Sequence, residues 1–297
     1  MKKLVQFLVW FRQIRGPFLI LTVVLVEIGI AGAFKDGVFH LGHSLLLLTG
    51  VILAHISVNL LNEYYDYQSG IDSSTRRTPF SGGSGLLQRG VTSSKSVKIA
   101  GYFTMLLSAL IGLYFCLASG WLVLIFMIGG GLAIRFYTSH FTRYLIGEFI
   151  SGLTLGTLVV LGVYYSLTKT ISTDMILISI PPGILTLLLL FLNEFPDVEA
   201  DKKGGRYHLV IHFGRKKCSR FYVAGLLAVY LWIGLVPWIS EIPSWIFLSF
   251  LTLPLALKTA MIVIKRYDHF ESMIPALGMN VGVVILTDFF LAVGLLL

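Results

Sequence analysis

Nine long apolar segments constrain the fold of this chain more than any other feature of its sequence. A helix that crosses a lipid bilayer needs about 20 mainly apolar residues. The segments that come close to or exceed that length are 17–34, 43–65, 95–118, 120–138, 144–168, 173–194, 217–238, 243–264 and 273–296. We therefore predict an all-α, polytopic membrane protein with nine transmembrane helices, in which residues 1–297 form a single domain.

The composition agrees with a membrane protein and excludes an ordinary soluble domain. Hydrophobic residues make up 56% of the chain and charged residues only 13%, whereas a typical soluble domain has about 25% charged residues. The net charge of +8 does not indicate nucleic-acid binding, because the charge is divided among the connections between the spans. The two cysteines, Cys116 and Cys218, fit no ligand spacing, so neither a disulfide framework nor a zinc site is expected.

The basic residues predict the orientation of the chain. Nearly all Lys and Arg lie at the N-terminus or in the connections after the second, fourth, sixth and eighth spans, and only Lys35 and Lys169 lie on the opposite side. Basic connections face the cytoplasm, so we expect the N-terminus inside and the C-terminus outside. No small-residue cleavage site follows the opening segment MKKLVQFLVWFRQIRG, which we interpret as an interfacial helix rather than a cleaved signal peptide.

Two Asn- and Asp-rich stretches occur where long apolar runs end: NLLNEYYDYQSGID at residues 59–72 and NEFPDVEAD at residues 193–201. Each leads into a long polar connection, about 66–94 and 195–216, and the expected orientation places both on the cytoplasmic side. Functional residues concentrate in loops that a rigid scaffold positions. We therefore look for the chemistry of the protein at these two stretches.

The spacing within the two stretches predicts that their polar side chains share a helical face. Asn62 and Asp66 are four residues apart, and the same spacing separates Asn193, Asp197 and Asp201. If the helices continue this far, residues four apart lie one above the other. Two such faces brought together would form one cluster of carboxylates and amides.

A cluster of this kind predicts a metal site that holds a diphosphate. Neighbouring carboxylates repel one another unless cations lie between them, and hard oxygen ligands favour Mg²⁺ or Ca²⁺. Mg²⁺ commonly binds through a few carboxylates together with substrate phosphates. The candidate metal ligands are Asp66, Asp72, Asp197 and Asp201, with solvated helix ends as the alternative interpretation. The amides of Asn62 and Asn193 could contact phosphate or metal, or else hydrogen-bond between helices.

Basic and glycine-rich segments next to the acidic stretches are candidates for phosphate binding. Arginine forks suit bidentate contact with phosphate, and glycines can form a backbone nest for anions. The candidates are Arg76, Arg77, Arg89 and the glycines at 82, 83 and 85 in the first connection, and Lys202, Lys203 and Arg206 in the second. Inside-positive charge and contacts with lipid headgroups are the alternatives.

Tyr137, His55 and Asn59 are further candidates for the substrate cavity. Tyr137, in the connection after the fourth span, could place an aromatic face near a reacting cation, although interfacial tyrosines are also common. His55 precedes Asn59 by one helical turn, so both could line a cavity below the metal site. Glu27 and Asp288 lie within spans, where an ionisable group usually faces a cavity or a partner.

These motifs resemble those of the UbiA superfamily of intramembrane prenyltransferases. The resemblance rests on NxxNEYYDYxxGxD near the end of the second span and NEFPDxExD at the end of the sixth. Together with YLIGEFISGLTLGTLVVLGVYY, they are most similar to the subgroup that prenylates 1,4-dihydroxy-2-naphthoate in menaquinone synthesis. The resemblance implies helices around a central cavity, a lateral opening toward lipid and two Mg²⁺ ions. It places the family's asparagines, aspartates and basic residue on Asn62, Asp66, Asp72, Asn193, Asp197, Asp201 and Arg206.

The sequence also departs from the family pattern. Glu63 occupies a position where the family usually has Asp, and GGRYHL replaces the common GKRTL. The connection TPFSGGSGLLQRG differs from that of the naphthoate subgroup, and Phe141 replaces the lysine of a Tyr-x-x-x-Lys pattern that begins at Tyr137. These departures bear on the acceptor rather than on the superfamily.

We therefore expect Mg²⁺-dependent transfer of a polyprenyl group from an allylic diphosphate to an aromatic, naphthoate-like acceptor, with release of diphosphate. The nearest alternative is geranylgeranyl transfer to a glycerol-phosphate lipid. A cation-coupled transporter is an alternative of another class, which acids in broken helices at mid-membrane would favour. A CDP-alcohol phosphotransferase is excluded, because its Asp-Gly-x-x-Ala-Arg signature is absent.

Overall fold

The fold is all-helical, as the apolar segments predict. A computed structural model describes residues 2–297, with side chains described at all of these positions except 2, 3, 73 and 74, and no β-strand occurs within this range. The α-helices are α1 (Lys2–Gln13), α2 (Ile20–Lys35), α3 (Leu41–Ser69), α4 (Ile71–Ser74), α5 (Ser94–Ser119), α6 (Leu122–Phe136), α7 (Gly147–Ser151), α8 (Leu158–Thr168), α9 (Thr173–Lys203), α10 (Leu209–Phe213), α11 (Arg215–Ile239), α12 (Leu253–Arg266) and α13 (Phe270–Leu296). The 3₁₀-helices are η1 (Gly16–Leu19), η2 (Phe141–Arg143) and η4 (Ser244–Thr252), and η3 (Gly152–Thr157) is a π-helical turn.

Local sequence accounts for several helix ends. Ser93 caps α5 by accepting a hydrogen bond from the Ser96 amide, and Ser172 caps α9 in the same way through Met175. A serine oxygen that accepts such a bond satisfies one of the amides left free at a helix N-terminus. At the other end of α3, Gly70 adopts a left-handed conformation with φ of 76°, which ends a helix without the steric cost of a Cβ atom.

Between residues 2 and 297, eight helical segments are long and apolar enough to cross a membrane. The remaining predicted span, 120–138, corresponds to α6, which has only 15 residues. The helix is short because it begins after Gly120 and gives way at Tyr137 to a turn that leads into η2. Fifteen residues make a helix of about 22 Å, so the count of nine spans stays a prediction.

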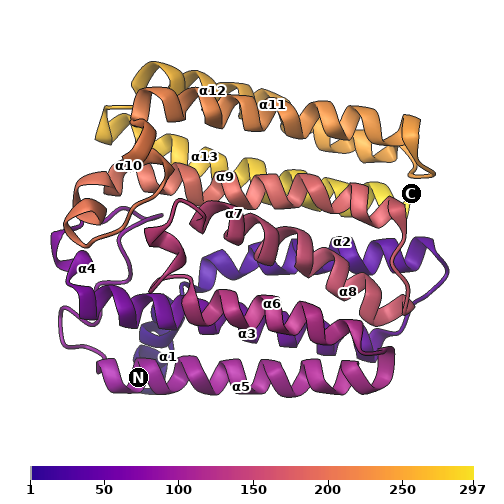
Figure 1. The fold of residues 1–297 in the computed structure, drawn as a ribbon, viewed down its shortest axis with the longest axis horizontal. Coiled ribbons are helices and arrows are strands. Elements are labelled where there is room, and N and C mark those ends of the chain that lie inside the picture. Colours follow the sequence, from indigo (N-terminus) through magenta and orange to yellow (C-terminus); the bar gives the residue numbers. More distant parts are fainter. Residues whose placement is uncertain (1) are drawn as a thin grey trace.

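The helices lie side by side along the long axis of the molecule, with α5 at one edge and α11 and α12 at the other (Figure 1). Apolar side chains fill most of the interior. On α2, for example, Leu25, Val26 and Ile28 are fully buried. Many large apolar side chains are exposed instead on outward faces, as expected where lipid rather than water is the solvent.

The packing brings the two acidic stretches to one end of the bundle. Helices α3 and α9 both continue beyond their apolar portions, so each stretch extends its own helix, and α4 and α10 lie together at the end opposite the C-terminus (Figure 1). Near the middle of α9, its backbone packs directly against η3. A Cβ atom added at Gly156 would lie 2.6 Å from the Gly183 Cα atom, so glycine is required for this close approach.

Candidate active site

Two adjoining pockets open between the helices. The larger is a mainly apolar cavity of about 370 Å³ between helices that include α3, α5, α6, α8 and α9, and the smaller is a polar pocket of about 110 Å³ at the end where the acidic stretches lie. Their shared lining marks where the two meet, and it consists of Arg15, Asn62, Phe80, Tyr137, Leu190 and Asn193. A ligand with a polar head and an apolar tail could therefore occupy both pockets at once.

All four aspartates predicted to bind metal line the polar pocket. Asp66 lies in the last turns of α3 and Asp72 in α4, whereas Asp197 and Asp201 lie one turn apart on α9. Asp66, Asp72 and Asp201 are buried, and Asp197 is half-buried. The predicted helical spacing thus holds within each stretch, and the fold brings the two stretches to one pocket.

Arg206 connects the two acidic stretches. Its guanidinium donates a hydrogen bond to Asp66 and another to Asp201 Oδ1 at 3.0 Å. Burial disfavours the charged guanidinium, but the carboxylates of Asp66 and Asp201 outweigh this cost and raise the pKa of Arg206 above its ordinary value. This residue therefore stays charged and places one positive charge between the two stretches.

The pKa of the Asp72 carboxyl is raised, because this group is buried close to other carboxylates. Burial, followed by the charges of Asp66 and Glu63, raises the pKa of the Asp72 carboxyl to about 6, against a hydrogen bond from Gln88 Nε2 at 2.9 Å. Among the described residues, Asp197 receives one side-chain hydrogen bond, a long one from Ser81 Oγ at 3.4 Å. These two carboxylates are thus poorly compensated by the protein itself.

The side chains of the polar pocket fit a hard divalent cation. Five acidic side chains line it, together with Arg15, Arg206 and His208, so the pocket is rich in carboxylate oxygens. The amide oxygen of Asn193 is buried there without a hydrogen-bond partner among the described residues. Carboxylate and amide oxygens are the ligands that Mg²⁺ and Ca²⁺ prefer, so the residues present are suited to hold such an ion.

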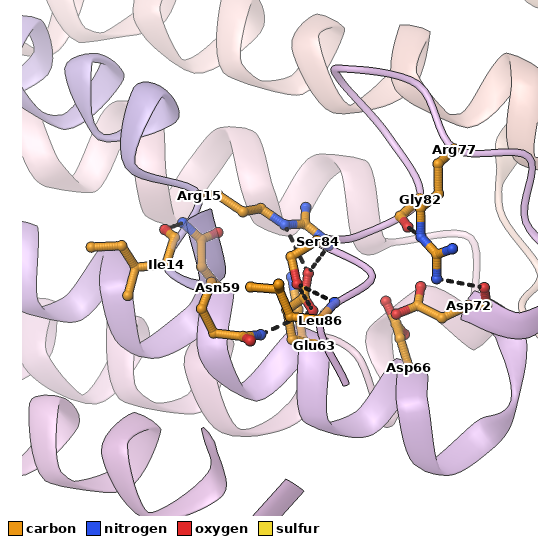
Figure 2. A network of polar contacts seen from close by, with 12 residues as sticks. Ile14, Arg15, Asn59, Glu63, Asp66, Asp72, Arg77, Gly82, Ser84 and Leu86 are labelled. Atoms are coloured by element: carbon orange, nitrogen blue, oxygen red, sulfur yellow. Dashed lines mark hydrogen bonds and ion pairs between the residues drawn. The ribbon is translucent and has the colours of Figure 1, made fainter. Parts of the chain in front are cut away.

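The candidate substrate-binding residues divide between the pockets. Tyr137, Asn62 and Asn193 lie at the junction, whereas His55 and Asn59 line the apolar cavity. His55 is hydrogen-bonded to the Thr22 hydroxyl, with 2.6 Å between Nδ1 and Oγ1. Asn59 donates to the Ile14 carbonyl at 2.9 Å (Figure 2), and the Thr138 hydroxyl donates to Asn62. The structure thus places His55 and Asn59 beside the cavity, with part of their hydrogen-bonding capacity already used.

Five of the six basic residues predicted to bind phosphate do not line the polar pocket: Arg76, Arg77, Arg89, Lys202 and Lys203. Arg76 turns outward, where it forms an ion pair with Glu271 and stacks over the Phe270 ring at 4.0 Å from the centroid. Arg77 donates to the carbonyls of Gly82 at 3.1 Å and Asp72 at 3.2 Å, so it stabilises its own loop (Figure 2). Lys202 is exposed on the outer side of α9. Of the predicted basic residues, only Arg206 lines this pocket.

The sequence analysis missed Arg15, which lines both pockets. Arg15 follows α1 and has a left-handed backbone with φ of 53°, which turns the chain into η1. The sequence does not single out Arg15 as a site residue, because arginines near a basic N-terminus also fit the positive-inside pattern. A non-glycine residue in this backbone region, followed at once by Gly16 and Pro17, is the local signal of a tight turn.

A second group that the sequence analysis missed lies beside Asp201. His208 Nε2 is 3.2 Å from Asp201 Oδ2, and its Nδ1 is 3.3 Å from Glu194 Oε2. Glu148 Oε1 accepts a hydrogen bond from the Leu209 amide at 2.8 Å. Glu148, Glu194 and His208 offer ligand atoms within 4.8 Å of one another, so this group could also hold a cation. Glu194 lies inside the NEFPD stretch, but nothing in the sequence predicts its partners.

Comparisons with known proteins show the family of the chain. A family model described as the UbiA prenyltransferase family matches residues 19–277. The chain is 32% identical over 264 residues to a 1,4-dihydroxy-2-naphthoate octaprenyltransferase of Bacillus subtilis (strain 168), covering 85% of this chain and 81% of that protein. It is 27% identical to the protein of the same name from Escherichia coli (strain K12), covering 97% and 95% of the two chains.

A solved structure is also similar in fold. It is a UbiA homologue from Archaeoglobus fulgidus bound to GPP and Mg²⁺, with a TM-score of 0.66 and 16% sequence identity. The similarity covers 96% of this chain and 99% of that one.

Proposed function

The chain belongs to the UbiA prenyltransferase family, and we propose that it transfers a polyprenyl group from an allylic prenyl diphosphate to a naphthoate-like aromatic acceptor, with Mg²⁺ bound at the four aspartates. The observation that carries this proposal is the polar, acid-rich pocket that opens directly onto an apolar cavity within a multi-pass membrane protein. A prenyl diphosphate has this same division into a charged head and an apolar chain.

The polar pocket supports binding of the diphosphate head. Asp66, Asp72, Asp197 and Asp201 would hold Mg²⁺, which when bound neutralises the diphosphate and the charge that develops as the C–O bond breaks. Arg206 is held by Asp66 and Asp201 with its guanidinium among these carboxylates, and it would stabilise the departing diphosphate. Arg15, at the junction of the pockets, would also contact the diphosphate.

The junction and the apolar cavity support the transfer step. The C–O bond breaks with its electron pair leaving on the diphosphate, and carbon one of the prenyl group forms a C–C bond with a carbon of the electron-rich acceptor ring. That ring carbon then loses the group it carried, as a proton or as CO₂ from the carboxylate, and the bonding electrons left behind restore the aromatic ring. Tyr137 lines both pockets, so its ring lies close to where carbon one would sit, and an aromatic face stabilises a cation. The apolar walls around the prenyl chain would keep water away from the allylic cation.

The relatives support the acceptor class. The two bacterial relatives described above carry a name that specifies 1,4-dihydroxy-2-naphthoate as the acceptor, and one is 32% identical to this chain. We propose the same class of acceptor here. We also propose that the polar pocket faces the cytoplasm, because basic residues surround both acidic stretches.

One assay tests the proposed function. Purified protein, Mg²⁺ and radiolabelled geranylgeranyl diphosphate would be incubated with 1,4-dihydroxy-2-naphthoate, 4-hydroxybenzoate or a glycerol-phosphate lipid, and the prenylated products separated by chromatography. We expect label to appear mainly in the naphthoate product. Preferred labelling of the lipid would show that the acceptor is the glycerol-phosphate lipid instead of the naphthoate. No transfer to any of the three would refute the proposal.

A further inference from the structure

Glu63 is a buried carboxylate next to the site that does not line either pocket. It follows Asn62 on α3 and has 0% exposure. Because neighbouring residues on a helix point about 100° apart, Asn62 faces the pockets while Glu63 faces the 81–85 loop, whose first residues line the polar pocket. Figure 2 shows Glu63 at the centre of a network between this loop and the end of α1.

Hydrogen-bond donors from two distant segments converge on this carboxylate. From the loop, the amide and the hydroxyl of Ser84 both donate to it, the hydroxyl at 2.9 Å. From the N-terminal segment, Gln13 Nε2 donates at 3.1 Å, and Arg15 Nε forms an ion pair at 3.7 Å. A buried carboxylate that receives several donors is well stabilised, and each of these bonds is charge-assisted. Glu63 therefore ties the loop and the N-terminal segment to α3.

The loop is shaped to fit between Glu63 and the metal-binding candidates. Gly83 has φ of +69°, and a Cβ atom added there would lie 2.9 Å from Asp72 Oδ2 and 3.0 Å from Glu63 Oε1. The backbone of Gly83 thus lies between two carboxylates that a larger residue would displace. This contact fixes the loop relative to both Glu63 and Asp72.

The same loop forms one wall of the polar pocket. Ser81, Gly82 and Gly83 line that pocket, and the Ser81 hydroxyl donates to Asp197 at 3.4 Å. Arg15, which Glu63 also holds, lines both pockets. Displacement of Glu63 would therefore move Arg15 and one wall of the polar pocket together.

We propose that Glu63 is a positioning residue for the diphosphate site, which fixes the 81–85 loop and Arg15 around the polar pocket without touching substrate itself. The inference rests on the proposed function of that pocket. An amide at this position would present its own NH₂ group toward the donors of Gln13, Arg15 and Ser84, so Glu63→Gln would lose part of the network. Glu63→Asp keeps the charge, at a shorter reach.

The test has one measurement that requires no substrate. Limited trypsin digestion, followed by mass spectrometry, would compare cleavage after Arg77 and Arg89 in the wild type, Glu63→Gln, Glu63→Asp and the matched control Glu241→Gln, which is exposed and distant from the site. Cleavage after Lys203 serves as the internal reference. We expect faster loop cleavage in Glu63→Gln only, with rates near the wild type in Glu63→Asp.

The second measurement concerns substrate. We expect the KM for the prenyl diphosphate to rise about ten- to hundredfold in Glu63→Gln, the range that corresponds to loss of a charge-assisted hydrogen bond. The KM for the acceptor should stay within about twofold, and Glu63→Asp should recover most of the loss. A residue that served stability alone would lower the amount of active protein without this difference between the two KM values.

The outcomes separate this inference from the proposed function. If Glu63→Gln cannot be purified folded, Ser84→Ala, which removes one hydroxyl donor and leaves the carboxylate in place, should show a smaller change of the same kind. Unchanged loop cleavage and an unchanged KM in an active wild-type background would overturn the inference. A wild type that transfers no prenyl group would refute the proposed function. The rate of loop cleavage would still test whether Glu63 holds the 81–85 loop in place.

Discussion

Replacing Asp197 with Asn is the sharpest test of a metal site shared by the two acidic stretches. The change removes one negative charge from the pocket and nearly preserves side-chain volume. The hydrogen bond that the Asp197 side chain receives from Ser81 Oγ at 3.4 Å can also be accepted by the amide oxygen of Asn. Folding should therefore change little, because removing one of several crowded carboxylates relieves repulsion.

The expected loss is in turnover. A ligand that neutralises charge on the leaving diphosphate acts most strongly in the transition state, and its removal costs about 3–5 kcal/mol, or roughly 10²–10⁴-fold in kcat. The assay measures initial rates of prenyl transfer at saturating diphosphate over a Mg²⁺ titration, with thermal unfolding in detergent as the control for folding.

Asp66→Asn should affect folding as well as turnover, because Asp66 forms an ion pair with Arg206 that only the structure reveals. Asp66 is one of two carboxylates that hold the largely buried Arg206. Its loss should destabilise the fold by about 1–3 kcal/mol in addition to its effect on kcat, because Arg206 keeps its charge and only Asp201 still pairs with it.

The combination of the two changes tests whether the stretches act as one unit. The double variant should lose much less activity than the product of the two single losses, because residues that act together are not additive. Near-normal turnover of Asp197→Asn at saturating diphosphate and limiting Mg²⁺ would refute the shared site. Fully multiplicative losses would show instead that the two stretches act independently.

Three further predictions follow from the same site. Excess EDTA should abolish prenyl transfer and added Mg²⁺ should restore it, so full turnover in EDTA would contradict the carboxylate site. Cysteines placed at the exposed positions Gln68 or Lys203 should resist a membrane-impermeant reagent added outside intact cells, whereas one beside Asp174 should react. The reverse pattern would invert the orientation. Arg76→Ala should change kcat/KM by less than about threefold, because an exposed ion pair contributes about 0–1 kcal/mol. Arg206→Ala should lower kcat/KM by about 10²-fold or more. Equal losses in the two variants would show that Arg76 moves into the pocket.

Much of the site could be predicted because its spacing is local. The interval of four residues from Asn62 to Asp66, and again along Asn193, Asp197 and Asp201, places side chains on one face of any helix that contains them. The structure adds that α3 and α9 continue far enough to do so. The basic residues were harder to assign, because positive charge near a membrane surface has several uses and spacing does not distinguish them.

The sequence by itself determined the helical membrane fold and the two acidic stretches, since apolar length and helical periodicity are properties of neighbouring residues. The tertiary structure alone decided which charges meet. Arg206 pairs with Asp66 across 140 residues of sequence, Arg76 pairs with Glu271 across 195, and Glu63 binds Gln13 across 50. Such pairs depend on how whole helices and loops pack, because an ion or a hydrogen-bond donor interacts with whatever lies within a few ångströms, wherever that residue occurs in the chain.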